Sequence, residues 1–233
     1  MTDQHFFFVH VQKTAGTALL RRMKAHFGTE GVYPDASDGI LPDAVLVHEL
    51  LGERFAARGD QIKVITGHFP LAVAEILPAD FTTLTVLREP VERTLSYLRH
   101  HGTLLAEDRD TPLEEIYADP FRFHGLIHNH MVKMFALTPE TMTAGALTHV
   151  EFEPHHLELA KERLATVDVV GIQERFEEFC DELERRFGWD LGPPLFANRT
   201  TPFEVSDEFR ARIAEDNALD VELYEFARDE LAI

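Results

Sequence analysis

A stretch near the start of the chain combines the residue types that bind anions. Residues 6–20 read FFFVHVQKTAGTALL, an apolar run that breaks into QKTAGT and then resumes with helical spacing. We expect a buried strand, a loop of small residues and a helix, in that order. The N–H groups at the start of such a helix favour anions, and the ammonium of Lys13 and the hydroxyls of Thr14 and Thr17 add to them. The stretch therefore predicts a phosphate-binding loop.

The spacing of this loop is not that of a Walker A motif, G-x-x-x-x-G-K-[ST], in which the lysine follows the second glycine. Here Lys13 precedes Gly16, and Val11 and Gln12 stand where the Walker loop needs flexibility. An ordinary nucleoside-triphosphate P-loop is therefore disfavoured. Taken alone, the stretch is equally compatible with a strand-to-helix turn that carries a solvated lysine.

Two later strands end in polar loops of the same kind. The run QIKVIT (residues 61–66) leads into Gly67-His68-Phe69, and FTTLTVL (residues 81–87) leads into Arg88 and a helix that carries Ser96. Repeated strand–loop–helix units predict an open parallel sheet, in which ligands bind outside the carboxyl ends of the strands. We therefore expect the three loops to converge at one edge of the sheet.

The remaining elements are predicted from hydrophobic periodicity and from turn residues. In the first half of the chain, residues 28–42 are expected to be irregular, 44–51 are ambiguous between strand and helix, and 71–77 and 91–100 are helical. Helices with Pro and Gly interruptions are expected over 111–164, followed by a strand over 167–172 and a helix that runs to residue 187. A long loop covers 188–202, and acidic helices cover 206–217 and 220–231. We expect one domain over residues 1–233. Its fold class is α/β, with a P-loop-like open parallel β-sheet flanked by helices and a helical C-terminal half.

Charge and cysteine content limit the possible partners. The 233 residues include 22 Lys and Arg against 41 Asp and Glu, a formal net charge of −19. Such a surface repels nucleic acid and anionic membranes, so we expect neither as a partner, and a polyanionic cofactor would need a local group of basic residues. The single cysteine, Cys180, excludes an intramolecular disulfide and falls at a core position of a predicted helix. No signal peptide or membrane span is visible, which predicts a cytoplasmic protein and leaves its oligomeric state open.

Taken together, FFVHVQKTAGTALL and LTVLREPVERTLSYLRH resemble the two cofactor loops of sulfotransferases that use 3′-phosphoadenosine 5′-phosphosulfate (PAPS). The sequence looks closest to the carbohydrate branch, which resembles heparan-sulfate 2-O-sulfotransferase. Family-like elements continue along nearly the whole chain, through Gly67-His68-Phe69, HNHMVKMF, VVGIQERFEEF, Asn198-Arg199-Thr200 and DVELY. Either loop alone is a weak signal, and both in this order are a strong one.

The resemblance implies which residues bind the cofactor. The family's 5′-phosphosulfate loop corresponds to Lys13, Thr14, Ala15, Gly16, Thr17 and Ala18, its 3′-phosphate site to Arg88 and Ser96, and its basic loop over the cofactor to Arg199 and Thr200. Gln173 could approach the adenine. The residue chemistry agrees, because PAPS carries phosphate at both ends and Arg88 offers a planar fork to one of them, with the Ser96 hydroxyl facing it.

The catalytic residues implied are Lys13, His68 and Ser96. Sulfuryl transfer to a hydroxyl depends mainly on positioning and electrostatics, as phosphoryl transfer does. Lys13 would stabilise the leaving phosphate of 3′-phosphoadenosine 5′-phosphate (PAP), and in the family the Ser96-type residue restrains that lysine. His68 is the predicted base because it ends a strand beside the lysine loop and has a family counterpart in a similar setting; Glu89 is the alternative. Asn129 is expected either in the acceptor pocket or on a helix surface.

Histidines are frequent in the middle of the chain. His124 and His128 stand four residues apart, and His130, His155 and His156 could add ligands to a metal on one helix face. The H-E-x-x-H spacing is missing, so we expect histidines on a solvated or substrate-facing surface and no metal.

The sequence thus predicts a PAPS-dependent sulfotransferase that acts on a hydroxyl of a carbohydrate or a glycosylated small molecule. The charge of −19 disfavours a long polyanionic glycosaminoglycan, so a neutral sugar, a glycolipid headgroup or a small metabolite fits better. One alternative is a P-loop-type nucleotide kinase or NTPase, which would bind ATP with magnesium. The other is a nucleotide-binding relative without catalysis, against which the presence of Lys13, His68, Arg88 and Ser96 speaks.

Overall fold

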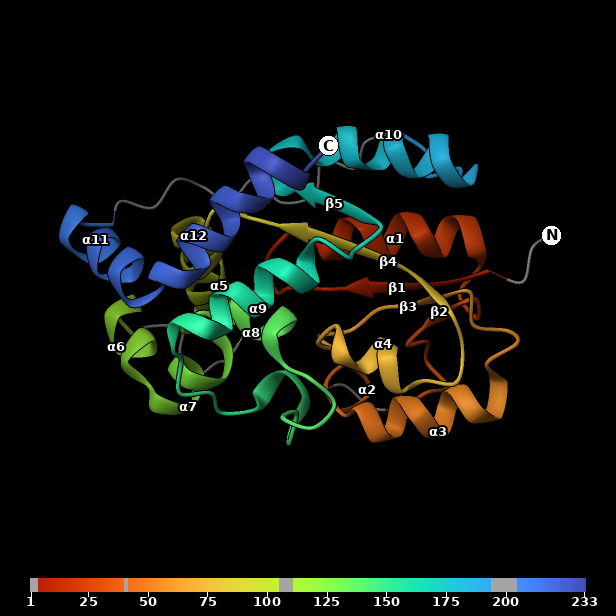
Figure 1. Ribbon diagram of the computed structural model, residues 1–233, viewed down its shortest axis with the longest axis horizontal. Coiled ribbons are helices and arrows are strands. Elements are labelled where there is room, and N and C mark those ends of the chain that lie inside the picture. Colours follow the sequence, from red (N-terminus) through yellow and green to blue (C-terminus); the bar gives the residue numbers. More distant parts are fainter. Residues whose placement is uncertain (1–3, 40–41, 105–110, 194–204) are drawn as a thin grey trace.

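The computed structural model describes residues 4–39, 42–104, 111–193 and 205–233. In these residues one parallel sheet has the strand order β2-β3-β1-β4-β5. The strands are β1 (His5–Val9), β2 (Val32–Tyr33), β3 (Val64–Ile65), β4 (Phe81–Leu87) and β5 (Val169–Ile172). The central strand β1 lies between β3 and β4 (Figure 1). The predicted α/β fold with an open parallel sheet is confirmed.

The apolar run of β1 is continuous because both faces of the strand are buried. Phe6 and Phe8 belong to the core on one face, while Phe7 and Val9 belong to the core on the other. Successive strand residues point to opposite faces, so a strand with helices on both sides must be apolar at every position.

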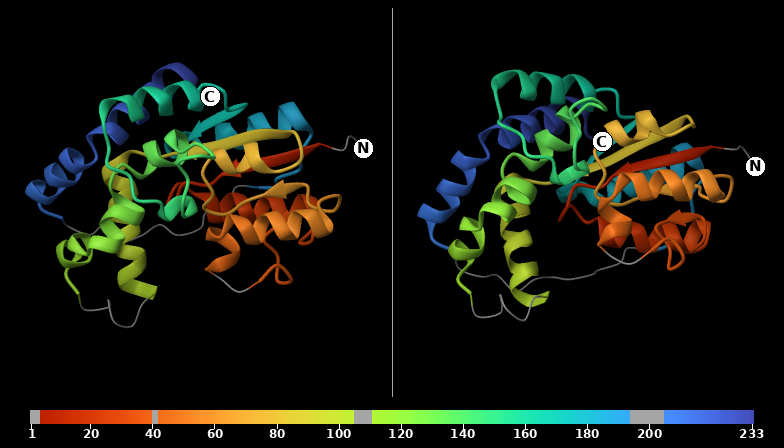
Figure 2. Two further views of the ribbon diagram at one scale, coloured as in Figure 1. Left: turned by 60° about the horizontal axis from the view of Figure 1, so that its bottom comes forward. Right: turned by 90° about the horizontal axis from the view of Figure 1, so that it is seen from below.

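Helices cover the two faces of the sheet separately (Figures 1 and 2). On one face α1 (Gly16–Phe27) and α10 (Phe176–Phe187) pack against the strands, and Cys180 is buried there as predicted. The opposite face carries α3 (His48–Arg58), α4 (Ala72–Ile76), α8 (His130–Ala136), α9 (Pro154–Leu164) and α12 (Ala218–Phe226).

A third apolar cluster lies beyond the carboxyl ends of the strands, on the left of Figure 1. It joins α5 (Pro90–Leu104), α6 (Leu113–Ala118), the π-helix η2 (Phe123–Ile127) and α11 (Asp207–Asp216). Shorter helical segments complete the described chain: α2 (Asp43–Leu46), α7 (Pro120–Arg122), η3 (Gly145–Leu147), η4 (Gln173–Arg175) and the π-helix η5 (Ala227–Leu231). The C-terminal half is helical apart from β5, as predicted.

The local predictions differ from the structure mainly at short elements. The segment 28–42, predicted as irregular, contains the edge strand β2, which is only two residues long and whose neighbours are Gly and Pro. The ambiguous segment 44–51 is helical and breaks at Val47 between α2 and α3. The strand predicted over 61–66 is shorter, since β3 covers only Val64–Ile65.

Candidate active site

Three loops meet at one edge of the sheet because β3, β1 and β4 are adjacent and parallel. The guanidinium of Arg88 donates a hydrogen bond to the carbonyl oxygen of Lys13 over 3.2 Å. The ring of His68 contacts the β1 end, with Nδ1 3.0 Å from the carbonyl oxygen of His10. The predicted convergence of the three loops is therefore present in the structure.

The lysine loop has a strained backbone and an open helix end. Lys13 and Ala15 have left-handed φ angles of 70° and 68°, which non-glycine residues adopt at a cost. In the part of the chain that the structure describes, no side chain caps α1 and no backbone acceptor pairs with the N–H groups of Gly16 and Thr17. Left-handed turns at a helix start direct N–H groups into a concavity that binds anions.

The side chains of this loop divide into two kinds. Thr14 is fully buried, and its hydroxyl donates to the carbonyl oxygen of Val11 over 2.8 Å, so only its backbone can face a ligand. Thr17 is exposed, and Ala15 and Ala18 are half-buried. The ammonium of Lys13 makes no hydrogen bond within the described residues and remains available to an anion.

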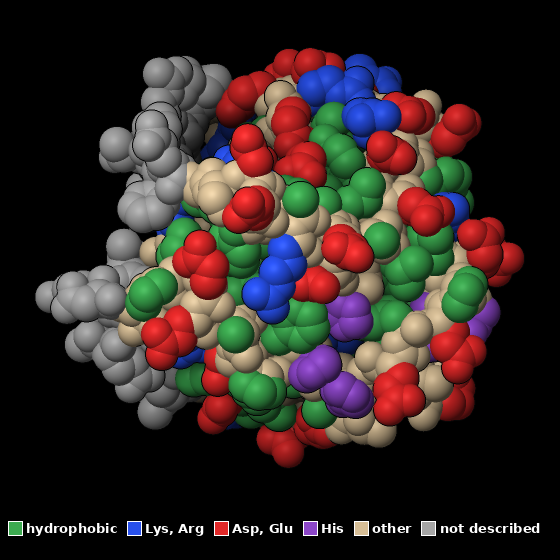
Figure 3. Space-filling view, turned by 90° about the vertical axis from the view of Figure 1, so that its left-hand side faces the viewer, with side chains coloured by type: hydrophobic (Ala, Val, Ile, Leu, Met, Phe, Trp, Pro, Cys, Tyr) green, Lys and Arg blue, Asp and Glu red, His purple; other side chains and the backbone are tan. Residues whose placement is uncertain are grey.

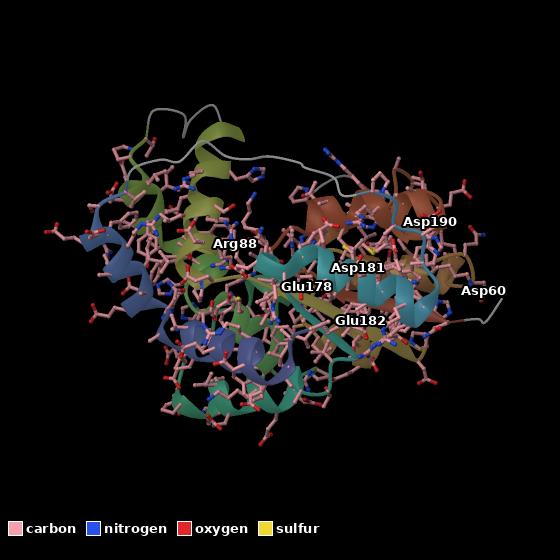
Figure 4. All side chains as sticks on the ribbon, turned by 90° about the horizontal axis from the view of Figure 1, so that it is seen from above. Asp60, Arg88, Glu178, Asp181, Glu182 and Asp190 are labelled. Carbon is pink, nitrogen blue, oxygen red and sulfur yellow. The ribbon has the colours of Figure 1, made fainter. Side chains whose placement is uncertain are left out.

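Arg88 directly follows β4 and precedes the start of α5 (Figure 4). Its Nε is buried without a hydrogen-bond partner among the residues described, although a guanidinium normally uses several of its N–H groups. Ser96 lies on α5 and is half-buried, and its hydroxyl forms no hydrogen bond to any described residue. The guanidinium of Arg88 and the hydroxyl of Ser96 are therefore donors to which a bound anion would supply acceptors.

The positive charges of Lys13 and Arg88 lie close together although the protein is acidic. Burial lowers the pKa of Lys13, and the nearby charge of Arg88 lowers it further. Lys13 in turn adds to the lowering of the pKa of His10, His68 and His100. Asp and Glu side chains spread over the outer face that the strands point toward (Figure 3). The positive charge of this cluster is thus that of Lys13 and Arg88, with the carboxylates of Glu89, Glu92 and Glu174 acting on Arg88; a polyanionic ligand needs a local basic pair of this kind.

The tautomer of His68 follows from its hydrogen bond. A carbonyl oxygen only accepts, so Nδ1 must carry the proton that it donates to His10, which leaves the lone pair of the neutral ring on Nε2. Burial and Lys13 lower the pKa of His68 below its usual 6.5, which keeps the ring neutral at pH 7. A half-buried neutral imidazole with an unprotonated nitrogen has the state required of a general base.

The alternative base, Glu89, is occupied by a structural role. Its two carboxylate oxygens accept from the backbone N–H groups of Val91 (3.1 Å) and Glu92 (2.8 Å), so Glu89 caps the start of α5. Its own N–H donates to Glu174, which also accepts from the hydroxyl of Tyr224. This pairing disfavours Glu89 as the residue that takes a proton from an acceptor.

The other predicted site residues have different positions. Gln173 follows β5, which lies beside β4, so it reaches the same sheet edge and is half-buried there. Arg199 and Thr200 lie outside the described residues. The expectation of Asn129 on a helix surface is wrong, and its place in an acceptor pocket stays a prediction. Asn129 is buried, and it links two helix starts, because its N–H donates to Asn217 and its Oδ1 accepts from the N–H of Asp220.

One residue of the site was not singled out from the sequence. His10 directly follows β1, and its ring lies against Phe8, Gly16 and His68. The position of His10 between the first strand and Lys13 could have indicated that it belongs to the site. Its contact with His68 could not be predicted locally, because the two residues are 58 positions apart.

The histidines of the middle segment form no metal site. Among the described residues, no group of three or more His, Cys, Asp or Glu side chains could hold a metal ion. His124, His128 and His149 contact one another or neighbouring aromatic rings, whereas His130 is fully buried. No helix in the described part of the chain combines the length and the apolar character needed to cross a membrane.

Comparison with known proteins supports the fold. No family model matches the sequence, and no curated protein matches it. A crystal structure of a sulfotransferase from Alicyclobacillus acidocaldarius is similar to this chain, with a TM-score of 0.50 and 17% sequence identity. The alignment covers 97% of this chain and 95% of that one. At this identity the likeness shows a shared fold, and the narrower resemblance to the heparan-sulfate 2-O branch stays a prediction.

Proposed function

We propose that this chain is a PAPS-dependent sulfotransferase whose single domain transfers a sulfuryl group to an acceptor hydroxyl. One observation carries the proposal: Lys13, the open start of α1 and the unsatisfied Nε of Arg88 lie on one sheet edge, in contact through the Arg88–Lys13 hydrogen bond. These donors fit a ligand with two separate anionic groups. The fold shared with a bacterial sulfotransferase is consistent with this use.

The two ends of the ligand would bind to different donors. The N–H groups of residues 14–18 and the ammonium of Lys13 would hold the 5′-phosphosulfate, since a helix start and a lysine favour such an anion. Arg88 would hold the 3′-phosphate through its planar fork, with the hydroxyl of Ser96 as a further donor. Gln173 would lie toward the adenine, and Arg199 and Thr200 toward the 3′-phosphate. No metal is required in this scheme.

The chain's own residues would supply the chemistry of an in-line transfer. His68 would accept the acceptor's proton on Nε2 as the acceptor oxygen forms its bond to sulfur. The bond between sulfur and the bridging oxygen would break, and Lys13 would stabilise the negative charge that develops on that oxygen in PAP. The proton would thus end on His68, the sulfuryl group on the acceptor and the electron pair on the leaving phosphate.

Ligand binding tests the central claim. Calorimetry without metal should show that PAP binds to the wild-type protein and that ATP binds much more weakly. Arg88→Ala should weaken PAP binding by roughly 10- to 100-fold, because a charge-assisted hydrogen bond contributes about 1.5–3 kcal/mol. Arg54→Ala, which removes a guanidinium from α3, is the matched control and should leave the PAP affinity unchanged. Tight ATP binding without PAP binding would favour a kinase or NTPase and defeat the proposal.

Transfer from labelled PAPS across a panel of acceptors tests catalysis and addresses the acceptor. We expect transfer to neutral sugars, glycolipid headgroups or small hydroxyl compounds rather than to long heparan-type chains, which the charge of −19 repels. Tight binding of heparan-type chains at physiological salt would contradict that expectation. PAP binding without transfer to any acceptor would favour a non-catalytic relative.

A further inference from the structure

The ring of His10 fills the space directly over the start of α1. A Cβ atom added to Gly16 would lie 1.8 Å from Nε2 of His10 and 2.2 and 2.5 Å from two of its ring carbons. The φ angle of Gly16 is not left-handed, so its backbone conformation does not demand glycine. Any side chain at position 16 would therefore have to displace the His10 ring.

The same residue also contacts His68. The carbonyl oxygen of His10 accepts from Nδ1 of His68 over 3.0 Å, and the two ring centroids lie 4.6 Å apart with an interplanar angle of 45°. On its other side the His10 ring stacks on Phe8, at 5.2 Å and 19°. The backbone N–H of His68 is anchored separately to the carbonyl oxygen of Val45 over 2.7 Å. These contacts leave the His68 ring little freedom to turn.

We propose that His10 is a positioning residue that couples the phosphate-binding loop to the catalytic base. Its ring sets how closely the start of α1 approaches β1 and restricts the orientation of the His68 ring, while its backbone carbonyl fixes the tautomer of His68. The roles of the loop in binding phosphate and of His68 as the base rest on the proposed function. The contacts that couple the loop to His68 through His10 are present in the protein without ligand. Burial and the neighbouring His68 and Lys13 hold the pKa of His10 well below 6.5, so its ring stays neutral and packs as an uncharged group.

A double-mutant cycle tests the coupling between His10 and Gly16. Gly16→Ala should weaken PAP binding by about tenfold or more, since the new methyl group displaces the His10 ring and the loop with it. His10→Ala should leave the PAP dissociation constant within a few fold and lower kcat. In Gly16→Ala/His10→Ala the PAP affinity should return toward that of the wild type, because the space is now free, while kcat should stay low.

A histidine at the other end of the same strand is the matched control. His5 also hydrogen-bonds a carbonyl oxygen through Nδ1, that of Ile62, and also contacts aromatic rings. His5→Ala should therefore not rescue Gly16→Ala. Additive effects of Gly16→Ala and His10→Ala on PAP affinity would overturn the inference. Thermal unfolding of each variant identifies any that fail to fold, and His10→Asn, which leaves a smaller void, replaces His10→Ala in that case.

A measurement without substrate separates this inference from the proposed function. Nitrogen NMR of the His68 ring should show the Nδ1–H tautomer in the wild type. In His10→Ala the backbone carbonyl that accepts from Nδ1 remains, so the tautomer should persist, but the ring should become more mobile and titrate closer to 6.5 as its burial decreases. Unchanged mobility and titration of the His68 ring would overturn the inference, even if PAP binds. Failure of the wild type to bind PAP would reject the proposed function and leave the NMR result to decide the coupling.

Discussion

Two lysine–arginine pairs in this protein have opposite surroundings. Lys13 and Arg88 lie at the open edge of the sheet, where the ammonium has no described partner and Arg88 donates only to the carbonyl oxygen of Lys13 among the described residues. Lys133 and Arg93 are fully buried behind it and donate to the last carbonyls of the π-helix η2. Lys133 binds the carbonyl oxygens of His124 and Gly125 at 3.1 and 2.6 Å, and Arg93 those of Leu126 and Ile127 at 3.0–3.3 Å. The Nε atoms of Arg88 and Arg93 are both unpaired, so the two pairs differ in their other N–H groups.

The same contrast holds for the helix starts near the two pairs. The start of α8 is capped by the buried carboxylate of Asp220, which accepts from Met131 and Val132. The start of α1 is uncapped. A lysine–arginine pair whose N–H groups donate to carbonyl oxygens of the chain stabilises helix ends. A pair whose N–H groups lack such acceptors can bind a ligand. Residue type alone does not distinguish the two uses.

Replacing the buried arginine should have the largest effect on stability. Arg93→Met should lower the free energy of unfolding by about 3–5 kcal/mol, because the change leaves the buried charge of Asp220 less compensated and two helix-end carbonyls without donors. Chemical denaturation measures this loss. Arg88→Met is the matched control and should cost much less, and equal losses for both variants would remove the contrast between the two pairs.

Replacing the open lysine should affect catalysis rather than folding. Lys13→Met should lower kcat for sulfuryl transfer by about 10²–10³-fold, the size expected when one donor to a developing oxyanion is removed. The melting temperature should stay the same or rise, because Arg88 loses a neighbouring like charge. Transfer rates with labelled PAPS and a thermal scan give both values. A large loss of stability with normal turnover would show that Lys13 stabilises the fold and is not needed for catalysis.

The pH dependence should report the state of His68. Its pKa is lowered by burial and by Lys13, so the unprotonated base persists below pH 6.5. We expect kcat/KM to rise with pH through that lowered pKa and to be level by pH 7, as the base form becomes complete. His68→Ala should abolish this acid limb together with most of the activity. An unchanged acid limb in His68→Ala would remove the base assignment and return Glu89 to consideration.

The smallest effect is expected at Glu89, whose carboxylate caps α5. Glu89→Ala should cost about 1 kcal/mol of stability, the usual loss for a helix N-cap. The turnover number should keep its order of magnitude. Thermal unfolding and kcat at pH 7.5 give the two values. A collapse of kcat with normal stability would show that Glu89 takes part in the chemistry.

Local sequence predicted the long elements and the place of the candidate site. The runs FFFV and VVGI are apolar or glycine at consecutive positions, which is typical of strands buried on both faces, and FTTLTVL is rich in β-branched residues; each is a strand in the structure. Parallel strands place their carboxyl ends together, so the meeting of Lys13, His68 and Arg88 followed from chain order. The edge strand β2 was missed because two residues carry no periodicity.

Only the tertiary structure decided which polar residues belong to the site. The segment HNHMVKMF gave no sign that Asn129 connects buried helix ends, since its partners Asn217 and Asp220 are about ninety positions away. Glu89 beside Arg88 is a helix cap, and His10, in the opening stretch, is the residue that contacts both Gly16 and His68. Sequence determined the strands, the loops and the donors, because these depend on near neighbours. The tertiary structure decided which polar and charged side chains have hydrogen-bond partners, because most of these partners come from distant parts of the chain that folding brings together.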